Sequence, residues 1–172
     1  MKFLAPLAFA LTATAGMALA DNHAKTVADI AIGSTDHTTL VAAVQAAGLV
    51  ETLQGEGPFT VFAPTNAAFE KLPAGTVDGL LKPEAKDQLT KILTCHVVPA
   101  KAMAADVAKM IADGSGSAKI ATVGGCEFTA KAEGDKVMIE DGQGNMATVT
   151  AVDLAAGNGV VHVIDTVLLP AN

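Results

Sequence analysis

The sequence contains no tryptophan and no tyrosine, and only four of its six phenylalanines lie beyond residue 20. The chain therefore lacks the aromatic side chains needed to stack on nucleic-acid bases or to line a sugar-binding site. The core must instead be built from Val, Leu, Ile, Ala and Met.

Positive charge is also scarce. The chain carries 11 Lys and Arg residues against 18 Asp and Glu residues, and without Lys2 its formal net charge changes from −7 to −8. Such an acidic surface repels nucleic acid and anionic membranes. We therefore expect neither as a partner.

Long hydrophobic runs are missing except at the start. Residues 1–20 (MKFLAPLAFALTATAGMALA) carry one charge and then small apolar residues, and they end in Ala18-Leu19-Ala20. This pattern is typical of a signal peptide. No later apolar run has membrane length, and the C-terminus carries no anchor signal. The sequence predicts an exported protein, periplasmic or secreted to the cell surface, without a transmembrane anchor.

After this leader, the sequence predicts a short polar segment, residues 21–25, followed by a single domain over residues 26–170. The helical period dominates its first half, at residues 26–53, 67–72, 83–93 and 102–112. A buried strand is expected at residues 59–63, and alternation predicts further strands at residues 119–123, 126–131, 136–140, 146–152 and 160–169. Helices followed by a mainly antiparallel sheet indicate the α+β class.

Three segments carry a family resemblance: residues 59–69 (FTVFAPTNAAF), 93–100 (LTCHVVPA) and 158–170 (NGVVHVIDTVLLP). In order and spacing they resemble the two signature blocks and the central histidine motif of the fasciclin domain. The resemblance implies a wedge-shaped β-sheet, mainly antiparallel, flanked by several helices. The matching fold-motif residues are Phe59, Phe62, Pro64, Thr65, Asn66, Phe69, His96, Asn158, Gly159, His162 and Asp165.

The resemblance also implies a function. Fasciclin domains usually act in adhesion, by binding cell-surface or matrix molecules, without chemistry of their own. We therefore expect a binding module rather than an enzyme, with no cofactor, whose partners are cell-surface or matrix proteins or a second copy of the chain. The alternative is a periplasmic ligand-binding or accessory protein of the cell envelope. That alternative predicts a well-formed pocket, whereas adhesion predicts an exposed apolar or mixed patch.

The two cysteines, Cys95 and Cys126, allow one intramolecular bridge. In an exported protein a disulfide is the first expectation. Closing a loop of this length would add about 3–4 kcal/mol of stability on the chain-entropy model. Two buried free thiols, or one reactive thiol, are the alternatives.

The adjacent Cys95-His96 pair also suggests a nucleophile with its base. On a strand, however, adjacent side chains point to opposite faces, so His96 is not expected to reach the Cys95 sulfur. His96 matches the histidine of the family's Tyr-His pair, while Cys95 replaces the tyrosine. An adhesive role through that tyrosine therefore cannot apply here. His96 is either hydrogen-bonded within the fold or a partner contact, and His162, inside an apolar strand, needs a buried partner.

Asp153-Leu154 matches the position of an Asp-Ile type pair that resembles the integrin-recognition motif of animal fasciclin domains. An exposed carboxylate beside an exposed aliphatic side chain is a plausible contact pair for a partner. The alternative is a strand end with one solvated acid.

Metal ligands are sparse. His23, His37, His96 and His162 show no short-spaced pairing, and residues 141–145 (DGQGN) depart from a calcium loop. We expect no metal site, with one conditional exception. If cleavage follows Ala20, the new N-terminus Asp21-Asn22-His23 can wrap Cu(II) or Ni(II) in a square plane.

Overall fold

The computed structural model describes residues 25–171. The predicted signal peptide and the conditional copper site at Asp21-Asn22-His23 lie outside the described residues. Within the described part, no helix has both the length and the apolar character needed to cross a membrane.

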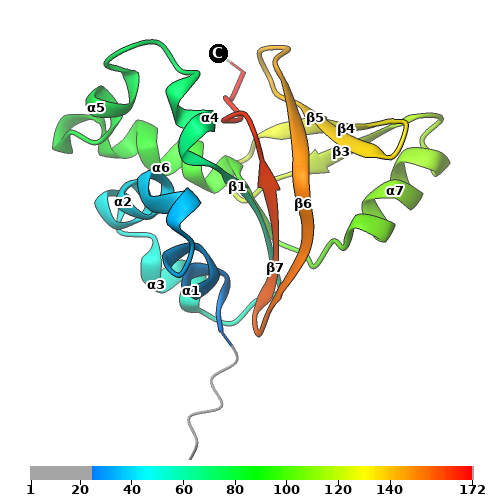
Figure 1. The fold of residues 1–172 in the computed structure, drawn as a ribbon, viewed down its shortest axis with the longest axis horizontal. Coiled ribbons are helices and arrows are strands. Elements are labelled where there is room, and N and C mark those ends of the chain that lie inside the picture. Colours follow the sequence, from blue (N-terminus) through cyan, green and yellow to red (C-terminus); the bar gives the residue numbers. More distant parts are fainter. Residues whose placement is uncertain (1–24, 172) are drawn as a thin grey trace, which may run out of the picture.

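The described strands form one seven-stranded sheet in the order β2-β1-β7-β6-β5-β4-β3 (Figure 1). Only the β1–β7 pairing is parallel, and the other five pairings are antiparallel. The α+β prediction with a mainly antiparallel sheet is confirmed. The strands are β1 (Phe59–Pro64), β2 (Val97–Val98), β3 (Ser117–Ala121), β4 (Glu127–Glu133), β5 (Lys136–Glu140), β6 (Met146–Ala156) and β7 (Gly159–Ile164).

The helices divide into two groups (Figure 1). Those that precede β2 in the chain gather beside β1 and β7, whereas α7 packs against β3 and β4 at the other end of the sheet. The first group comprises α1 (Val27–Ile32), η1 (Thr35–His37), α2 (Thr38–Ala47), α3 (Val50–Gln54), α4 (Asn66–Glu70), α5 (Thr76–Leu80), η2 (Pro83–Ala85) and α6 (Lys86–Cys95); α7 spans Ala104–Asp113.

Two hydrophobic clusters make up the core. Val61 of β1 belongs to the cluster under the first helix group, and its neighbour Phe62 belongs to the cluster around α7 and β3–β6. Adjacent strand residues point to opposite faces, so β1 supplies both clusters. Every residue of β7 is buried, as expected for a central strand covered on both faces.

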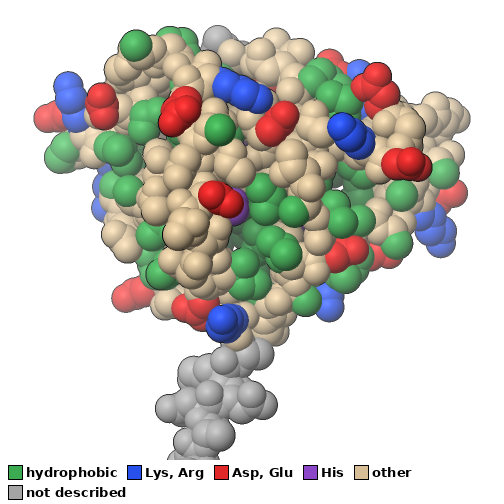
Figure 2. Space-filling model, in the orientation of Figure 1, with side chains coloured by type: hydrophobic (Ala, Val, Ile, Leu, Met, Phe, Trp, Pro, Cys, Tyr) green, Lys and Arg blue, Asp and Glu red, His purple; other side chains and the backbone are tan. Residues whose placement is uncertain are grey.

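The charged side chains on the face drawn in Figure 2 lie mostly around its periphery. Apolar side chains gather over the middle of this face and toward α7. The adhesion hypothesis predicts such a mixed surface.

Several bounds of the sequence prediction are wrong; β6, for example, extends to Ala156 instead of residue 152. The last strand ends at Ile164 instead of residue 169, because the backbone N–H groups of Leu168 and Leu169 bond to side chains rather than to a strand. The Cys95-His96 pair does not lie on a strand. Cys95 is the last residue of α6, His96 caps that helix, and β2 begins only at Val97.

Candidate functional site

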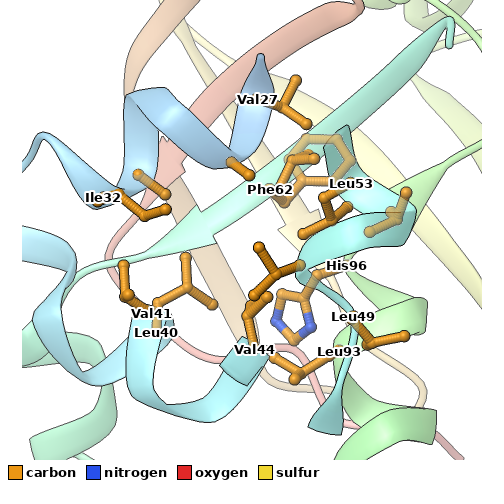
Figure 3. A pocket seen from close by; sticks show the side chains of 15 residues that line it. Val27, Ile32, Leu40, Val41, Val44, Leu49, Leu53, Phe62, Leu93 and His96 are labelled. Carbon is orange, nitrogen blue, oxygen red and sulfur yellow. The ribbon is translucent and has the colours of Figure 1, made fainter. Parts of the chain in front are cut away.

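An apolar cavity lies between the first helix group and β1 (Figure 3). Its volume is about 40 Å³. Fourteen of its fifteen lining residues are apolar, and the fifteenth is His96. The labelled side chains from α1, α2, α3 and α6 point toward one another across it. Such a cavity can hold a small apolar group but offers no charge with which to act on it.

His96 is a structural residue in this site. Its Nδ1–H donates to the carbonyl of Ile92 at 2.8 Å, and its Nε2 accepts the N–H of Leu168 at 2.9 Å. The side chain is 2% exposed. Burial lowers the pKa of His96 to about 4, although the Ile92 carbonyl and the charge of Asp141 favour its protonated form. With both nitrogens used inside the fold, His96 offers no surface to a partner, and its interpretation as a contact residue is corrected.

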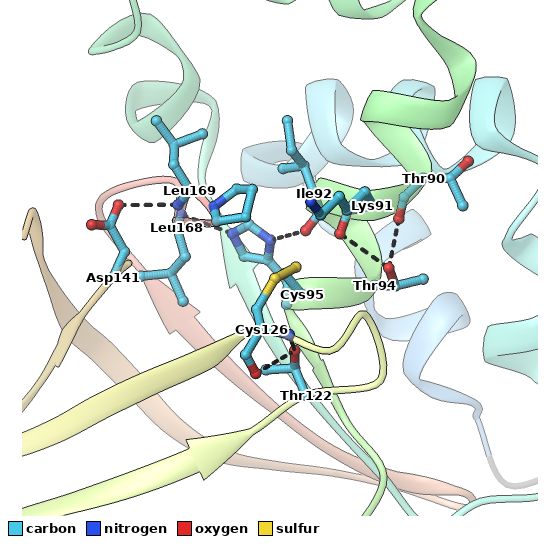
Figure 4. Close-up of a disulfide and its surroundings, with 12 residues drawn as sticks. Thr90, Lys91, Ile92, Thr94, Cys95, Thr122, Cys126, Asp141, Leu168 and Leu169 are labelled. Atoms are coloured by element: carbon cyan, nitrogen blue, oxygen red, sulfur yellow. Dashed lines mark hydrogen bonds between the residues drawn. A yellow bond between two sulfur atoms is a disulfide. The ribbon is translucent and has the colours of Figure 1, made fainter. Parts of the chain in front are cut away.

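Cys95 and Cys126 are joined by a disulfide (Figure 4). Their Cα atoms are 5.4 Å apart, within the usual range for such a bond. The bridge fastens the end of α6 to the turn before β4. Because both sulfurs are bonded, Cys95 has no thiol with which to attack a substrate.

His162 of β7 contacts three other segments: β1, β6 and the segment before α7. Its Nε2–H donates to the carbonyl of Ala102 at 2.7 Å, and its Nδ1 accepts the N–H of Asp153 at 3.3 Å. Its ring stacks on Phe62 with the ring centres 5.7 Å apart. The side chain therefore holds β7, β1, β6 and the segment before α7 together.

Asn158, in the turn between β6 and β7, joins the start of α1 to the end of α3. Its Nδ2 donates to the carbonyls of Leu53 and Gly55, at 2.7 and 2.8 Å, and its Oδ1 accepts the N–H of Val27 at 2.9 Å. The next residue, Gly159, lies against β1, where an added Cβ would stand 1.9 Å from a carbonyl oxygen. Only glycine fits this close approach.

The first signature block supplies helix caps. Thr65 accepts the N–H of Ala68 at 3.3 Å and so begins α4. The Oδ1 of Asn66 accepts the N–H of Thr39 at 3.0 Å, and its Nδ2 donates to the carbonyl of Thr35 at 3.1 Å. The block therefore fixes both α4 and the start of α2.

Asp165 follows β7 and fixes the neighbouring strand. Its Oδ1 accepts the N–H of Thr148 at 2.8 Å, and its Oδ2 lies 3.6 Å from Nζ of Lys71. Burial alone would raise the pKa of this carboxyl, but the hydrogen bonds from Thr148 and Thr166 and the charge of Lys71 lower it. Asp165 is thus an ionised, partly exposed acceptor that ties the end of β7 to β6.

Sequence reasoning missed two buried polar anchors. Thr60 donates to the carbonyl of Ala100 and accepts the N–H of Ala102 at 2.8 Å. The carboxylate of Asp141 is 6% exposed and accepts N–H groups from Gln143, Asn145 and Leu169 at 2.8–3.0 Å. The bond from Leu169 to Asp141 joins the turn to the distant C-terminal segment, and no local sequence signal encodes it.

Asp153 and its two neighbours form an exposed step in β6, residues 152–154, which we call the β6 bulge. The pairing with β7 shifts register between Ala151 and Leu154, and Asp153 has a left-handed backbone with φ of 57°. Its Oδ1 accepts the N–H of Ala104, the first residue of α7, at 2.7 Å. The apolar neighbours are exposed, Val152 by 44% and Leu154 by 38%. The structure therefore brings Asp153 and Leu154 together at the surface, but leaves His96 inside.

The described residues contain no group of three or more His, Cys, Asp and Glu side chains that could hold a metal ion. His37 and His162, both buried, bond instead to a serine hydroxyl and to backbone groups.

Comparisons with known proteins agree with this geometry. The sequence model of the fasciclin domain matches residues 35–170. Protein sll1483 of Synechocystis is 52% identical over 151 residues, which cover 88% of this chain and 77% of that protein. The cell surface glycolipoprotein MPB83 of Mycobacterium bovis is 41% identical over 122 residues, covering 71% of this chain and 48% of that protein.

A solved structure is also similar. It is a FAS1 domain pair from the insect cell adhesion molecule fasciclin I, and it matches with a TM-score of 0.56 and 25% identity. The match covers 73% of this chain and 42% of that one.

Proposed function

The chain belongs to the fasciclin domain family, and from this premise we propose that it is a non-catalytic adhesion module. It attaches cells to one another, or to a surface or matrix, through protein–protein contacts. The similar insect protein is a cell adhesion molecule, and the similar mycobacterial protein lies at the cell surface. We propose the same side of the envelope for this chain, as an exported periplasmic or cell-surface protein.

The observation that carries this proposal is the β6 bulge. Val152 and Leu154 are exposed apolar side chains on either side of the Asp153 carboxylate. The bulge is braced from behind by His162 and α7 through hydrogen bonds of 3.3 and 2.7 Å. A rigid pair of apolar contacts beside a charge loses little conformational entropy on binding.

Beads coated with the purified protein are expected to cluster, with each other or with cells of the source strain. Leu154→Ala should reduce clustering severalfold because it removes an exposed apolar contact. Clustering is measured by fluorescence microscopy and flow cytometry.

Met146→Ala is the matched control. Met146 is 37% exposed, close to the 38% of Leu154, and lies at the other end of β6. Adhesion through the bulge predicts that this variant clusters like the wild type. Wild-type beads that bind neither each other nor cells would contradict the adhesion proposal.

A second candidate function rests on the apolar cavity. We propose, as the alternative, a ligand-binding or accessory protein of the envelope that takes a small apolar ligand, or one end of a longer apolar chain, beside α1. The nearly uniform apolar lining supports this candidate.

Xenon, a small apolar probe, is expected to bind in this cavity, and its binding is measured by xenon NMR. Ala31→Phe should weaken xenon binding about tenfold, because Ala31 lines the cavity and a phenyl ring there would fill it. Ala42→Phe, on an exposed position of α2 outside the lining, is the matched control. Equal binding by both variants would eliminate the cavity as the ligand site.

A further inference from the structure

A second surface feature lies on the other side of β6. β5 pairs with β6 only from Met138↔Thr148 to Glu140↔Met146, so among the described strands residues 149–156 of β6 pair with β7 alone. Lys136 and Val137 of β5 continue to pair with β4 and diverge from β6. This leaves an open strand edge inside the sheet.

The open edge lacks charged and proline residues. Natural sheets block exposed edges with charges, prolines or bulges, since unpaired backbone groups invite another strand. Residues 149–152 read Val-Thr-Ala-Val, with neither charge nor proline, and the pairing with β7 shifts register once between Val149 and Ala151 and again at the β6 bulge. These four residues are also good strand formers, apart from Ala151.

A groove runs along this edge. It has a volume of about 640 Å³ and is walled by α7 on one side, where three small side chains, Ala104, Ala105 and Ala108, line it. Lys136 and Val137 line its other side, and residues 148–152 form its floor. In Figure 2 the surface is hollowed between β6 and α7, with apolar side chains beside the hollow.

A smaller apolar hole adjoins the groove. Val137, Val149 and Val152 line both, and the hole continues inward to Phe62 and His162. Its volume is about 10 Å³, close to the lower limit for one water-sized group. An extended chain paired with the edge would place alternate side chains toward such a hole.

We propose that this groove binds an extended segment of another protein, which adds to the sheet as a strand beside β6. Backbone groups of residues 149–152 supply the pairing, the alanines of α7 leave room for the segment, and the hole selects a small apolar side chain. The groove fits one strand rather than a second copy of the sheet, because α7 stands where further strands would lie. The inference rests on the proposed function, since it names a partner class for a binding module.

The test selects a random peptide library displayed on phage against the wild-type protein and counter-selects it against Ala108→Arg. Ala108 is exposed, and arginine is a good helix former, so this change fills the groove without disturbing the core. Ala112→Arg, one turn further along α7 and outside the lining, is the matched control. Enriched peptides are synthesised and titrated by fluorescence anisotropy.

Enriched peptides are expected to bind Ala108→Arg about tenfold or more weakly than the wild type, and to bind Ala112→Arg like the wild type. N-methylation of alternate peptide amides should abolish binding in one register and spare it in the other, which only strand pairing explains. The proposal is overturned if no peptide distinguishes the two arginine variants, if methylation has no effect, or if Ala108→Arg instead dissolves a homodimer.

The bead assay separates this inference from the adhesion proposal. If peptides bind but beads do not cluster, the groove proposal is supported and the adhesion proposal is contradicted. If Ala108→Arg beads still cluster and no peptide is selected, the adhesion proposal is supported and the groove proposal is contradicted.

Discussion

The Cys126→Ala variant is expected to unfold with a free energy about 3–4 kcal/mol below that of the wild type. The disulfide spans a sequence separation of 31 residues, and removing it releases the unfolded chain from that closed loop. Cys126 is the better residue to replace, because Cys95 is fully buried and its truncation would add a cavity. The measurement is urea denaturation followed by circular dichroism.

The variant should still adopt the native fold. The turn before β4 remains docked through the N–H groups of Val123 and Gly124, which donate to Val97 and Thr94 at 2.8 and 3.1 Å. An added Cβ at Gly124 would stand 2.6 Å from Oγ1 of Thr94, so the turn is also tightly packed there. The loss of stability is therefore expected without a loss of structure.

Reducing agent supplies the control for this experiment. It should destabilise the wild type by a similar amount and leave Cys126→Ala unchanged, because the variant has no bridge to lose. A variant as stable as the oxidised wild type would mean that the bridge does not constrain the unfolded chain.

Local periodicity was sufficient to predict much of this fold. The strand at residues 136–140 is observed at those bounds, because its alternating side chains lie between two antiparallel neighbours. The motif residues identified the family, and their polar members turned out to bind across the fold. The side chain of Asn158, for example, bonds to Val27, Leu53 and Gly55, which all lie more than 100 positions away.

Other features depend on contacts that no local pattern encodes. The sequence LTCHVV is compatible with either a helix end or a strand. The buried hydrogen bonds of His96 to Ile92 and Leu168 stabilise the helix end. The parallel pairing of β1 with β7 joins residues about 100 positions apart. The open edge of β6 exists because β5 turns away toward β4 at Val137, which depends on three strands together.

Acid is expected to destabilise the protein through His96. The pKa of a histidine in the unfolded chain is about 6.5, whereas burial lowers that of folded His96 to about 4. Above pH 6.5 the side chain is neutral in both states and contributes nothing to the pH dependence. Between pH 6.5 and 4, His96 is protonated in the unfolded chain but stays mostly neutral in the folded protein. The free energy of unfolding therefore falls as the pH is lowered. At pH 4 the loss amounts to about 3 kcal/mol, and below that pH it levels off.

Urea denaturation of the wild type and of His96→Gln at pH 7.5 and 4.5 isolates this contribution. Carboxylates titrate in both proteins, so the difference between their pH dependences belongs to His96. His96→Gln should be less stable than the wild type at pH 7.5, because the Leu168 N–H and the Ile92 carbonyl lose well-placed partners. Its stability should nevertheless fall by about 2–3 kcal/mol less than that of the wild type on acidification. Burial lowers the pKa of His37 as well, so His37→Gln should change the slope in the same direction. Equal slopes for the wild type and His96→Gln would mean that His96 becomes protonated without leaving its buried position, and the two backbone bonds would then not require its neutral form.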